Sequence, residues 1–376
     1  MVIRIAIKLG FTLLCNAAPC VLAVHAPDAI GSTTDIQGTR RAVYTRGRYT
    51  RGTREGDDAP AGFVSRASAP LPPNIDDHIV ATGSSALHFA AGSRESLAGR
   101  FERLTLPHWS AQAVAQTFAV SGEEAADLVV RMGSYPGALP MREDVPRWSA
   151  YVRDAILDPA IGRDILALAS VRRPALLRQV FGVAASSPAQ IVSLQKLQGQ
   201  LQDVGALETV AHYLALLEEA FLVAPVPKYS TRAARRRASP PKLVTLNNAL
   251  VAVMDPQGIA SLAEDPARFG TWVENACLAH AWNSGQGVSY WREEPLEVDG
   301  ILEGSWGKWA IEVRTGKFQM NDLTGLLEFT RRHPAFKPLV ICNAIGRATV
   351  ERAEIPAITW QEFLLAGPPG TAKSGT

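Results

Sequence analysis

The chain has 376 residues, of which 47% are hydrophobic, and its 38 lysines and arginines nearly balance 36 aspartates and glutamates. This length and apolar content predict a globular body with roughly two or three domains, each large enough to bury a core. The formal net charge of +2 excludes a global positive field, so any affinity for nucleic acid must come from local patches.

The cysteines and histidines form no recognisable metal or catalytic pattern. The four cysteines are Cys15, Cys20, Cys277 and Cys342, and their spacing fits no zinc site. Cys277 and Cys342 lie among apolar residues, which predicts small core residues. The seven histidines are scattered, so the sequence predicts neither a zinc site nor a histidine-based triad.

The leader, residues 1–73, differs in composition from the rest of the chain. Residues 1–26 have a basic start, an apolar centre and a small-residue end, the outline of a secretory signal, and the apolar centre is too short for a membrane span. Residues 39–54 carry six arginines without periodicity, and residues 59–73 are rich in proline, alanine and serine. Such a composition buries too little apolar surface to order itself, which predicts a disordered or unrelated leader.

The middle of the chain predicts a winged-helix domain. Helices are expected over residues 176–181, 191–200 and 204–220. Residues 202–206, which contain a glycine, occupy the turn of a helix-turn-helix. Four arginines within residues 232–237 would form the wing, ahead of a strand over residues 242–246.

This domain has two interpretations. Thr209 and His212 on the expected recognition helix, together with the wing arginines, could contact DNA phosphates. The same helix carries Glu208, Glu218 and Glu219, which repel phosphate. The acidic residues favour, by a small margin, a domain that packs against the rest of the protein and leaves its arginines in solvent.

The C-terminal third predicts an α/β unit around a small mixed sheet. The expected elements are a helix over 269–280, a strand over 288–292, a hairpin joining 296–300 to 311–314, a helix over 323–332, a strand over 338–343 and a closing segment over 358–365. A glycine-rich turn at 303–308 joins the two strands of the hairpin.

The hairpin brings two acids and a cation together. Side chains alternate along a strand, so Glu312 and Arg314 point to one face while Ile311 and Val313 point into the core. Asp299 lies at the same edge if the strands pair through the turn. Two carboxylates at a strand end suit a hard divalent cation, and the neighbouring guanidinium suits phosphate or water.

Glu274 is a candidate third carboxylate, delivered by the helix over 269–280. A more ordinary interpretation applies to each acidic residue. The hairpin charges would then lie in solvent, and Glu274 would be a solvent-facing helix residue. Short motifs of this kind recur by chance, so the pattern alone does not decide between the two.

The order of these segments resembles the C-terminal domain of a large prokaryotic family. The matching runs are 273–275, 290–292, 297–299, 310–313, 325–326 and 337–340. Members of this family are predicted AAA-type ATPases that end in an uncharacterised domain of PD-(D/E)xK nuclease-like fold. The family usually has lysine where this chain has Arg314.

Segments upstream resemble the second half of the family's ATPase. Residues 78–87 are similar to the sensor strand, whose polar residue, Ser84 here, lies beside the terminal phosphate of the nucleotide. Residues 95–102 are similar to the segment after it, which implies that Arg100 is a phosphate sensor or arginine finger. Residues 133–137 match the turn that leaves the ATPase lid, and residues 163–165 and 209–223 match the winged helix.

The first half of that ATPase is missing from the sequence. No Gly-x-x-x-x-Gly-Lys-[Ser/Thr] loop precedes Ala81, and Asn74–Asp77 has no apolar run before its acids. Residues 367–374 resemble a phosphate loop, with 363–366 before them like a strand, yet no helix follows to present amides to phosphate. The resemblance therefore implies an N-terminally truncated or frame-disrupted member, for which ATP binding and ATPase activity are not expected.

The expected architecture is α/β and multidomain. Its parts are a leader (1–73), the second half of an AAA-type core and lid (74–148), a winged-helix domain (149–246), a PD-(D/E)xK nuclease-like domain (247–366) and a disordered tail (367–376). A cytoplasmic location is expected, with export through residues 1–26 as the alternative. DNA, a partner protein or a second copy of the chain are the expected partners.

The resemblance implies a metal-dependent cleavage of DNA phosphodiesters. Asp299 and Glu312, with the carbonyl of Val313, would bind Mg²⁺, and Glu274 would support the metal or its waters. Arg314 can hold phosphate but stays protonated, which leaves the usual general base of the family in doubt. The alternative is a non-catalytic remnant that binds DNA or protein.

Overall fold

The computed structural model describes residues 102–166, 171–201, 207–230, 239–351 and 354–370, together with six short strands between residues 4 and 83. The nucleotide-sensor candidates Ser84 and Arg100 lie outside the described residues, as do the expected turn at 202–206 and the wing at 232–237. Within the described part of the chain, no helix has the combination of length and hydropathy that crossing a bilayer requires.

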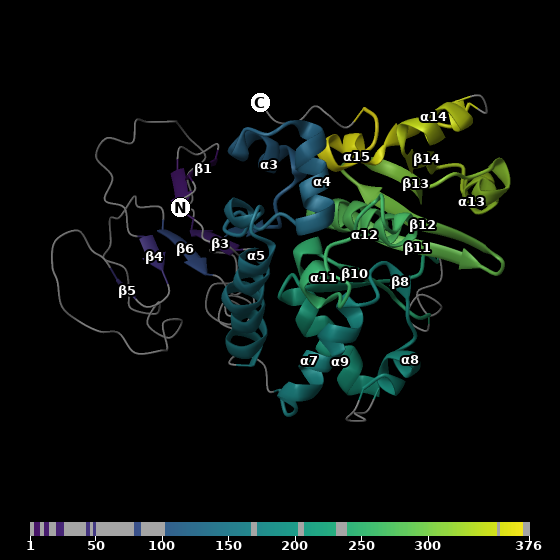
Figure 1. Ribbon diagram of the computed structural model, residues 1–376. Helices are drawn as coiled ribbons and strands as arrows, with labels where there is room; N and C mark the ends of the chain where they lie inside the picture. The colour runs from purple at the N-terminus through teal and green to yellow at the C-terminus, as the bar shows by residue number, and fades with distance from the viewer. Residues whose placement is uncertain are drawn as a thin grey trace.

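The N-terminal strands, purple in Figure 1, join the expected leader to the segment after it. They are β1 (Arg4–Ile7), β2 (Phe11–Leu14), β3 (Cys20–His25), β4 (Val43–Thr45), β5 (Arg48–Tyr49), β6 (Ile79–Gly83) and β7 (Glu102–Leu106). Strand β3 lies between β6 and β7 and pairs antiparallel with both. The expected boundary at residue 73 therefore falls inside one sheet. An apolar run such as β3 is compatible with a strand as well as with a signal sequence.

A helical segment follows, in which side chains cap the helix N-termini. It contains α3 (Ala111–Phe118), α4 (Gly122–Met132), η1 (Leu139–Met141), α5 (Val145–Tyr151) and two π-helical stretches, η2 (Val152–Leu157) and η3 (Ala160–Ile165). Ser110, Ser121 and Asp144 cap α3, α4 and α5, because each side chain accepts a hydrogen bond from a backbone N–H of the first turn.

The middle segment alternates helices with a small antiparallel sheet. Its elements are α7 (Pro174–Ala185), β8 (Gln190–Ile191), α8 (Leu194–Gly199), α9 (Leu207–Glu219), β9 (Val223–Val226), β10 (Lys242–Thr245) and α11 (Asn248–Met254). The sheet order is β8-β10-β9. The helix expected over 191–200 is shorter than predicted: Ile191 pairs with Lys242 in the sheet, and Ser193 caps a helix that begins at Leu194.

The C-terminal segment is the mixed sheet that the sequence predicts. Its elements are α12 (Pro266–Asn283), β11 (Gly287–Glu293), β12 (Leu296–Gly304), β13 (Gly307–Arg314), η4 (Met320–Leu323), α13 (Thr324–Arg332), β14 (Lys337–Cys342), α14 (Ala344–Glu351), β15 (Ala357–Thr359) and α15 (Trp360–Ala366). The order is β11-β12-β13-β14-β15, in which β11, β12 and β13 are antiparallel neighbours and β13, β14 and β15 are parallel.

Apolar residues cover both faces of this sheet. Ile311 and Val313 of β13 belong to a large core that also contains α12, the middle segment and α4. Ala310, on the other face of β13, belongs to a second core with Leu326 and Phe329 of α13. The C-terminal sheet therefore forms the middle layer of an α/β/α arrangement, visible at the upper right of Figure 1.

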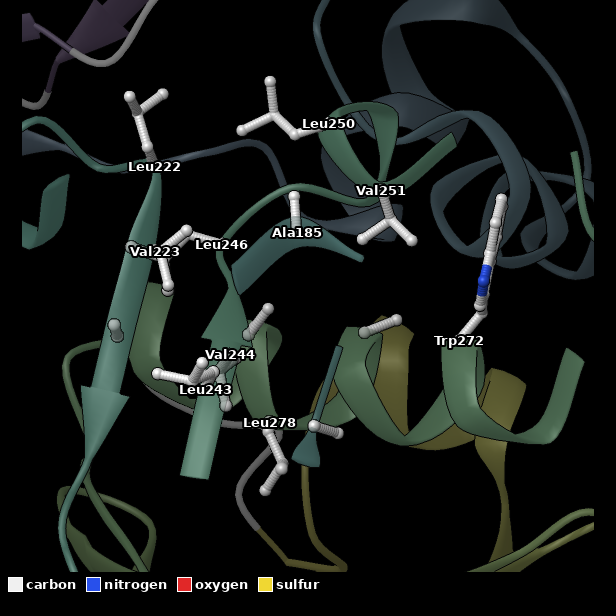
Figure 2. Packing of buried hydrophobic residues seen from close by; sticks show 14 of the residues in the cluster. Ala185, Leu222, Val223, Leu243, Val244, Leu246, Leu250, Val251, Trp272 and Leu278 are labelled. Carbon is white, nitrogen blue, oxygen red and sulfur yellow. The ribbon is translucent and has the colours of Figure 1, made fainter. Parts of the chain in front are cut away.

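The large core is continuous across the expected domain boundaries at residues 148 and 246. Figure 2 shows part of it: Val223 and Val244 of the small sheet, Val251 of α11, and Trp272 and Leu278 of α12 belong to this one core. The winged-helix and nuclease-like segments, as the sequence delimits them, thus share one interior. Helix α12 is central to it, because it packs against α4, β10, β13 and α15.

The end of the described chain differs from the expectation of a disordered tail from residue 367. Residues 363–366 are helical rather than a strand, because Thr359 and Glu362 form a capping box that begins α15. Gly367 has a φ of 76° and ends that helix, and a side chain there would meet the ring of Trp306. Gly367 and Pro368 are both buried, so packed chain extends past the expected boundary.

Candidate functional site: a buried carboxylate cluster

The hairpin register places the two acids of the motif side by side. Gly300 of β12 pairs with Ile311 of β13, so Asp299 and Glu312 are the next residues along the two antiparallel strands. Asp299 is 7% exposed and Glu312 is 2% exposed. The interpretation of the hairpin acids as ordinary solvated charges is therefore wrong for this pair.

Gly300 allows α12 to lie close to this end of the hairpin. A Cβ atom at Gly300 would lie 2.8 Å from both the Leu278 side chain of α12 and the Ile311 side chain of β13. The missing side chain thus permits a close approach of helix and sheet. Glu274 lies one turn before Leu278 on the same helix, and its carboxylate acts on Asp299 across the ammonium of Lys242.

A lysine that the sequence analysis missed lies among these acids. The Nζ of Lys242 donates hydrogen bonds to Glu274 Oε1 at 2.8 Å and to the backbone carbonyl of Asp299 at 3.2 Å. It also lies 3.5 Å from Asp299 Oδ1 and 3.5 Å from Glu297 Oε1. The side chain is 2% exposed. We call the group the carboxylate cluster; it consists of Lys242, Glu274, Glu297, Asp299, Glu312 and Arg314.

The sequence held a weak signal for Lys242. The residue opens an apolar strand, β10, and its main chain pairs with Ile191 and Val226 on either side. A lysine in the central strand of a sheet is buried only if it is paired with acids. Those acids come from α12 and β12, more than thirty residues away along the chain, and no local pattern connects them.

Arg314 joins Asp299 and Glu312, as the alternation along β13 predicts. Its guanidinium forms a short contact with Glu312 Oε1 and lies 4.0 Å from Asp299 Oδ2. Asp299 Oδ2 also accepts a hydrogen bond from the backbone N–H of Val313 at 2.9 Å. The Arg314 side chain is 37% exposed, so this cation borders the solvent, whereas Lys242 does not.

The face of β13 that carries Glu312 is buried, which the alternation did not predict. Ala310 lies on the same face and packs in the second core, because α13 covers that side of the sheet. As a result Glu312 Oε2 is withdrawn from solvent and has no hydrogen-bond partner. A buried carboxylate oxygen without a partner is energetically costly.

The environment raises the pKa of two of the acids. Burial and the nearby charge of Asp299 raise the pKa of Glu274 to about 7, against the opposing influence of Lys242. Burial and Asp299 also hold the pKa of Glu312 well above its usual range, although Arg314 acts in the opposite direction. Burial disfavours a charged Lys242, but Glu274 and Asp299 outweigh it and raise the pKa of the ammonium. These pKa shifts arise because the charged groups lie close together and away from water.

The cluster has oxygen ligands and an unbalanced charge. With every group ionised, the four carboxylates face Lys242, Arg314 and Arg292, which pairs with Glu297 at 3.7 Å, and this leaves a formal charge of 3 − 4 = −1. An all-oxygen, negatively charged donor set suits a hard divalent cation such as Mg²⁺. The unpartnered Glu312 Oε2, next to Asp299, fits the expectation that these two residues hold it.

Glu274 does not join that pair as the sequence analysis expects. The ammonium of Lys242 lies between Glu274 and Asp299 and binds both. Among the residues that the structure describes, no group of three or more histidine, cysteine, aspartate or glutamate side chains has the geometry of a metal site. The candidate metal ligands are therefore Asp299 and Glu312, and Glu274 is the partner of Lys242.

A separate hollow of about 290 Å³ lies between α3, α4, the start of α11 and α12. Its lining carries no charged side chain and includes no residue of the carboxylate cluster. His108 lines it, and both ring nitrogens of His108 are bonded, to the Phe221 carbonyl at 2.8 Å and to Asn247 at 3.2 Å. Burial lowers the pKa of His108 to about 4, so the hollow is uncharged at neutral pH.

Comparisons with known proteins give a family for part of the chain. Residues 123–261 match a domain family of unknown function (DUF8612). This segment contains Lys242 and ends before Glu274. No curated protein matches. The crystal structure of protein VC1899 from Vibrio cholerae is similar over 70% of this chain and 61% of that protein, at 10% sequence identity and a TM-score of 0.20. The chain thus spans about three-fifths of the length of that protein.

Proposed function

We propose that the carboxylate cluster is the active site of a metal-dependent phosphodiesterase that cleaves DNA. The observation that supports this most directly is the pair Asp299 and Glu312, buried side by side, with Glu312 Oε2 lacking a partner. A bound cation next to Asp299 would satisfy that oxygen. The oxygen atoms of the cluster support the same conclusion, because an all-oxygen donor set suits a hard divalent cation.

The residues of the chain would hold and orient the reacting groups. Asp299 is fixed by the Val313 N–H, and Glu312 is fixed by Arg314. Arg314 borders the solvent and presents a planar guanidinium that can bind two phosphate oxygens. It stays protonated at any accessible pH and does not serve as a general base. Mg²⁺ held by Asp299 and Glu312 would supply Lewis acidity toward the phosphodiester and would activate water.

Cleavage of plasmid DNA tests this proposal. The purified chain is incubated with supercoiled plasmid and millimolar Mg²⁺ or Mn²⁺, with EDTA as the metal-free control. We expect nicked or linear product that Asp299→Ala and Glu312→Gln reduce at least a hundredfold, and that ATP does not change. Glu303→Gln is the matched control, because Glu303 lies on the same strand, β12, in an exposed ion pair with Lys308.

Two results would reject the proposal. One is equal cleavage by the wild type and Asp299→Ala, which would identify a contaminating nuclease. The other is the absence of product with every divalent cation tried.

The position of Lys242 favours a second candidate function. Its ammonium already lies between Glu274 and Asp299, as it would in a site that has lost its metal. In that case the protein is a non-catalytic module that binds DNA or a partner protein. Gel-shift measurements over a range of salt concentrations distinguish the two functions: binding that falls steeply with salt, without cleavage, supports the module.

A further inference from the structure

We infer that Lys242 is a built-in counter-cation of the carboxylate cluster, which holds the metal-free form together and weakens the binding of a divalent cation. The inference rests on the proposed function of the same site, because it concerns the metal that this function needs. It concerns the affinity of the site for a metal ion and not the rate of DNA cleavage.

The ammonium of Lys242 lies among the acids as a bound cation would. Its Nζ lies within 3.5 Å of oxygen atoms from three acidic residues: Glu274, Glu297 and Asp299. It donates a further hydrogen bond to the Asp299 carbonyl. An ammonium has three N–H donors, and these acceptors satisfy them. Lys242 therefore takes the place of a counter-ion that would otherwise come from solution.

The backbone keeps this ammonium in place. Lys242 lies on the central strand of the small sheet, where β8 and β9 pair with it on both sides. With 2% of its side chain exposed, the ammonium has no direct route into solvent. Arg314 differs, because its guanidinium is 37% exposed and can turn toward a substrate. The ammonium of Lys242 would therefore remain among the acids when a metal ion binds.

A metal at Asp299 and Glu312 would be a close neighbour of that ammonium. Asp299 Oδ1 lies 3.5 Å from Lys242 Nζ, so an ion bound to Asp299 would lie only a few ångströms from a fixed positive charge. Like charges separated by about 4 Å in a partly buried site repel strongly enough to change an affinity by more than tenfold. Removing the charge of Lys242 should therefore strengthen metal binding, although it removes a stabilising partner of Glu274.

Mn²⁺ titration tests the inference without reference to catalysis. The dissociation constant is measured by electron paramagnetic resonance and calorimetry for the wild type, Lys242→Gln and Lys242→Arg. We expect Lys242→Gln to bind Mn²⁺ at least tenfold more tightly, and its melting temperature to rise more on addition of Mn²⁺ than that of the wild type. Lys242→Arg keeps the charge and should bind Mn²⁺ as weakly as the wild type. Equal or weaker binding by Lys242→Gln overturns the inference.

A second pair of variants covers the case in which Lys242→Gln does not fold alone. Replacing both members of the buried ion pair by amides, in Lys242→Gln with Glu274→Gln, leaves no unpaired charge at that position. We expect this double variant to bind Mn²⁺ at least tenfold more tightly than Glu274→Gln alone. If the two bind equally, Lys242 does not oppose the metal.

The outcomes separate this inference from the proposed function. Tighter Mn²⁺ binding by the variants that carry Lys242→Gln, with no DNA cleavage by any form of the protein, leaves the inference standing and rejects the nuclease. Cleavage that depends on Asp299, with no change in Mn²⁺ affinity on loss of Lys242, rejects the inference alone.

Discussion

Glu274 and Asn275 are neighbours on α12, yet they belong to two buried polar networks of opposite character. The side chain of Asn275 accepts a hydrogen bond from the Thr245 N–H at 2.9 Å and donates to the Thr245 carbonyl at 2.7 Å and to Asn248 Oδ1 at 2.8 Å. Asn248 in turn donates to two backbone carbonyls. Every group in this network is uncharged, whereas Glu274 belongs to the carboxylate cluster.

The two networks differ in charge, and this difference separates a network that stabilises the fold from one that is a candidate for function. The asparagine network pairs its amide donors and acceptors within the core, which stabilises the fold. Each network holds one buried oxygen without a partner, Thr245 Oγ1 in the first and Glu312 Oε2 in the second, but only the carboxylate cluster contains ionisable groups, two of them with raised pKa values. Buried charges of this kind cost stability unless they are fully paired.

The largest expected effect is the loss of the asparagine network. Asn275→Ala leaves the Thr245 N–H and carbonyl and Asn248 Oδ1 without their partner, and we expect the free energy of unfolding to fall by about 4 kcal/mol. Urea unfolding measures it. The control is Thr271→Ala on the same helix, whose hydroxyl bonds only within α12 and whose loss should be nearly neutral. A loss below about 1 kcal/mol for Asn275→Ala would contradict the structural role of the network.

The second-largest expected effect is a loss of folding stability at acid pH, which two buried histidines cause. Burial lowers the pKa of His108 and of His280 to about 4, so between pH 6.5 and pH 4 the unfolded chain binds protons that the folded protein does not. Stability therefore falls as the pH drops through this range, by roughly 2 to 3 kcal/mol per histidine below pH 4. Urea unfolding across this range, with His280→Phe as the variant, measures the contribution of His280.

His280 lies beside the rings of Trp306 and Phe363, and its Nε2 is buried without a partner. A phenyl ring in its place keeps the aromatic contacts and cannot be protonated. The variant should lose about half of the acid sensitivity, and an unchanged pH dependence would assign the effect to other groups.

Glu274 should give a smaller effect of the opposite sign. Its pKa is raised to about 7, so between pH 4.5 and pH 7 the folded protein keeps a proton that the unfolded chain has released. This contribution to stability is present below pH 4.5 and is lost as the pH rises toward 7. Glu274→Gln removes it, and the change in unfolding free energy between pH 5 and pH 7.5 should shift by about 1 to 2 kcal/mol.

Thermal melts of the wild type and Glu274→Gln at matched ionic strength show this difference. Asp265→Ala, which removes the N-cap of the same helix, serves as a control that lowers stability by a similar amount at every pH in this range. A Glu274→Gln profile parallel to that of the wild type would mean that Glu274 has an ordinary pKa.

The smallest effect is expected far from either network. Asp127 and Arg131 of α4 form an exposed ion pair, with 41% and 45% of their side chains in solvent. Such a pair contributes little, because water and salt screen it, and Asp127→Asn should change the free energy of unfolding by at most about 0.5 kcal/mol. Chemical denaturation at low and high salt measures it, and a larger loss would show that charge on this helix acts beyond its own pair.

Local patterns predicted the elements of the site but not its full composition. The alternation along β13 and the glycine-rich turn placed Asp299, Glu312 and Arg314 together, and the hairpin register confirms that placement. The predicted core positions of Cys277 and Cys342 are also confirmed. These features depend on residues close in sequence, or on periodicities that a single strand or helix displays.

Long-range contacts account for what the sequence did not predict. Lys242 reaches the acids from another sheet, and Glu312 is buried because α13 covers a face that local alternation assigned to solvent. The start of α15 could have been found, because Thr359 and Glu362 show the capping-box spacing. The pairing of β3 with β6 and β7 had no such signal, since an apolar run fits a strand as well as a leader.

Because it includes Lys242, the carboxylate cluster is formed by residues from both halves of the chain. Its ammonium comes from before the expected boundary at residue 246, and the four carboxylates come from after it. An excised fragment of residues 247–366 would carry those acids with Arg292 and Arg314 as basic partners but without Lys242, which binds Glu274 and Asp299. The packing of the two halves against each other therefore determines the geometry of the cluster, and an insertion that separated them would disrupt it without changing any of its acids.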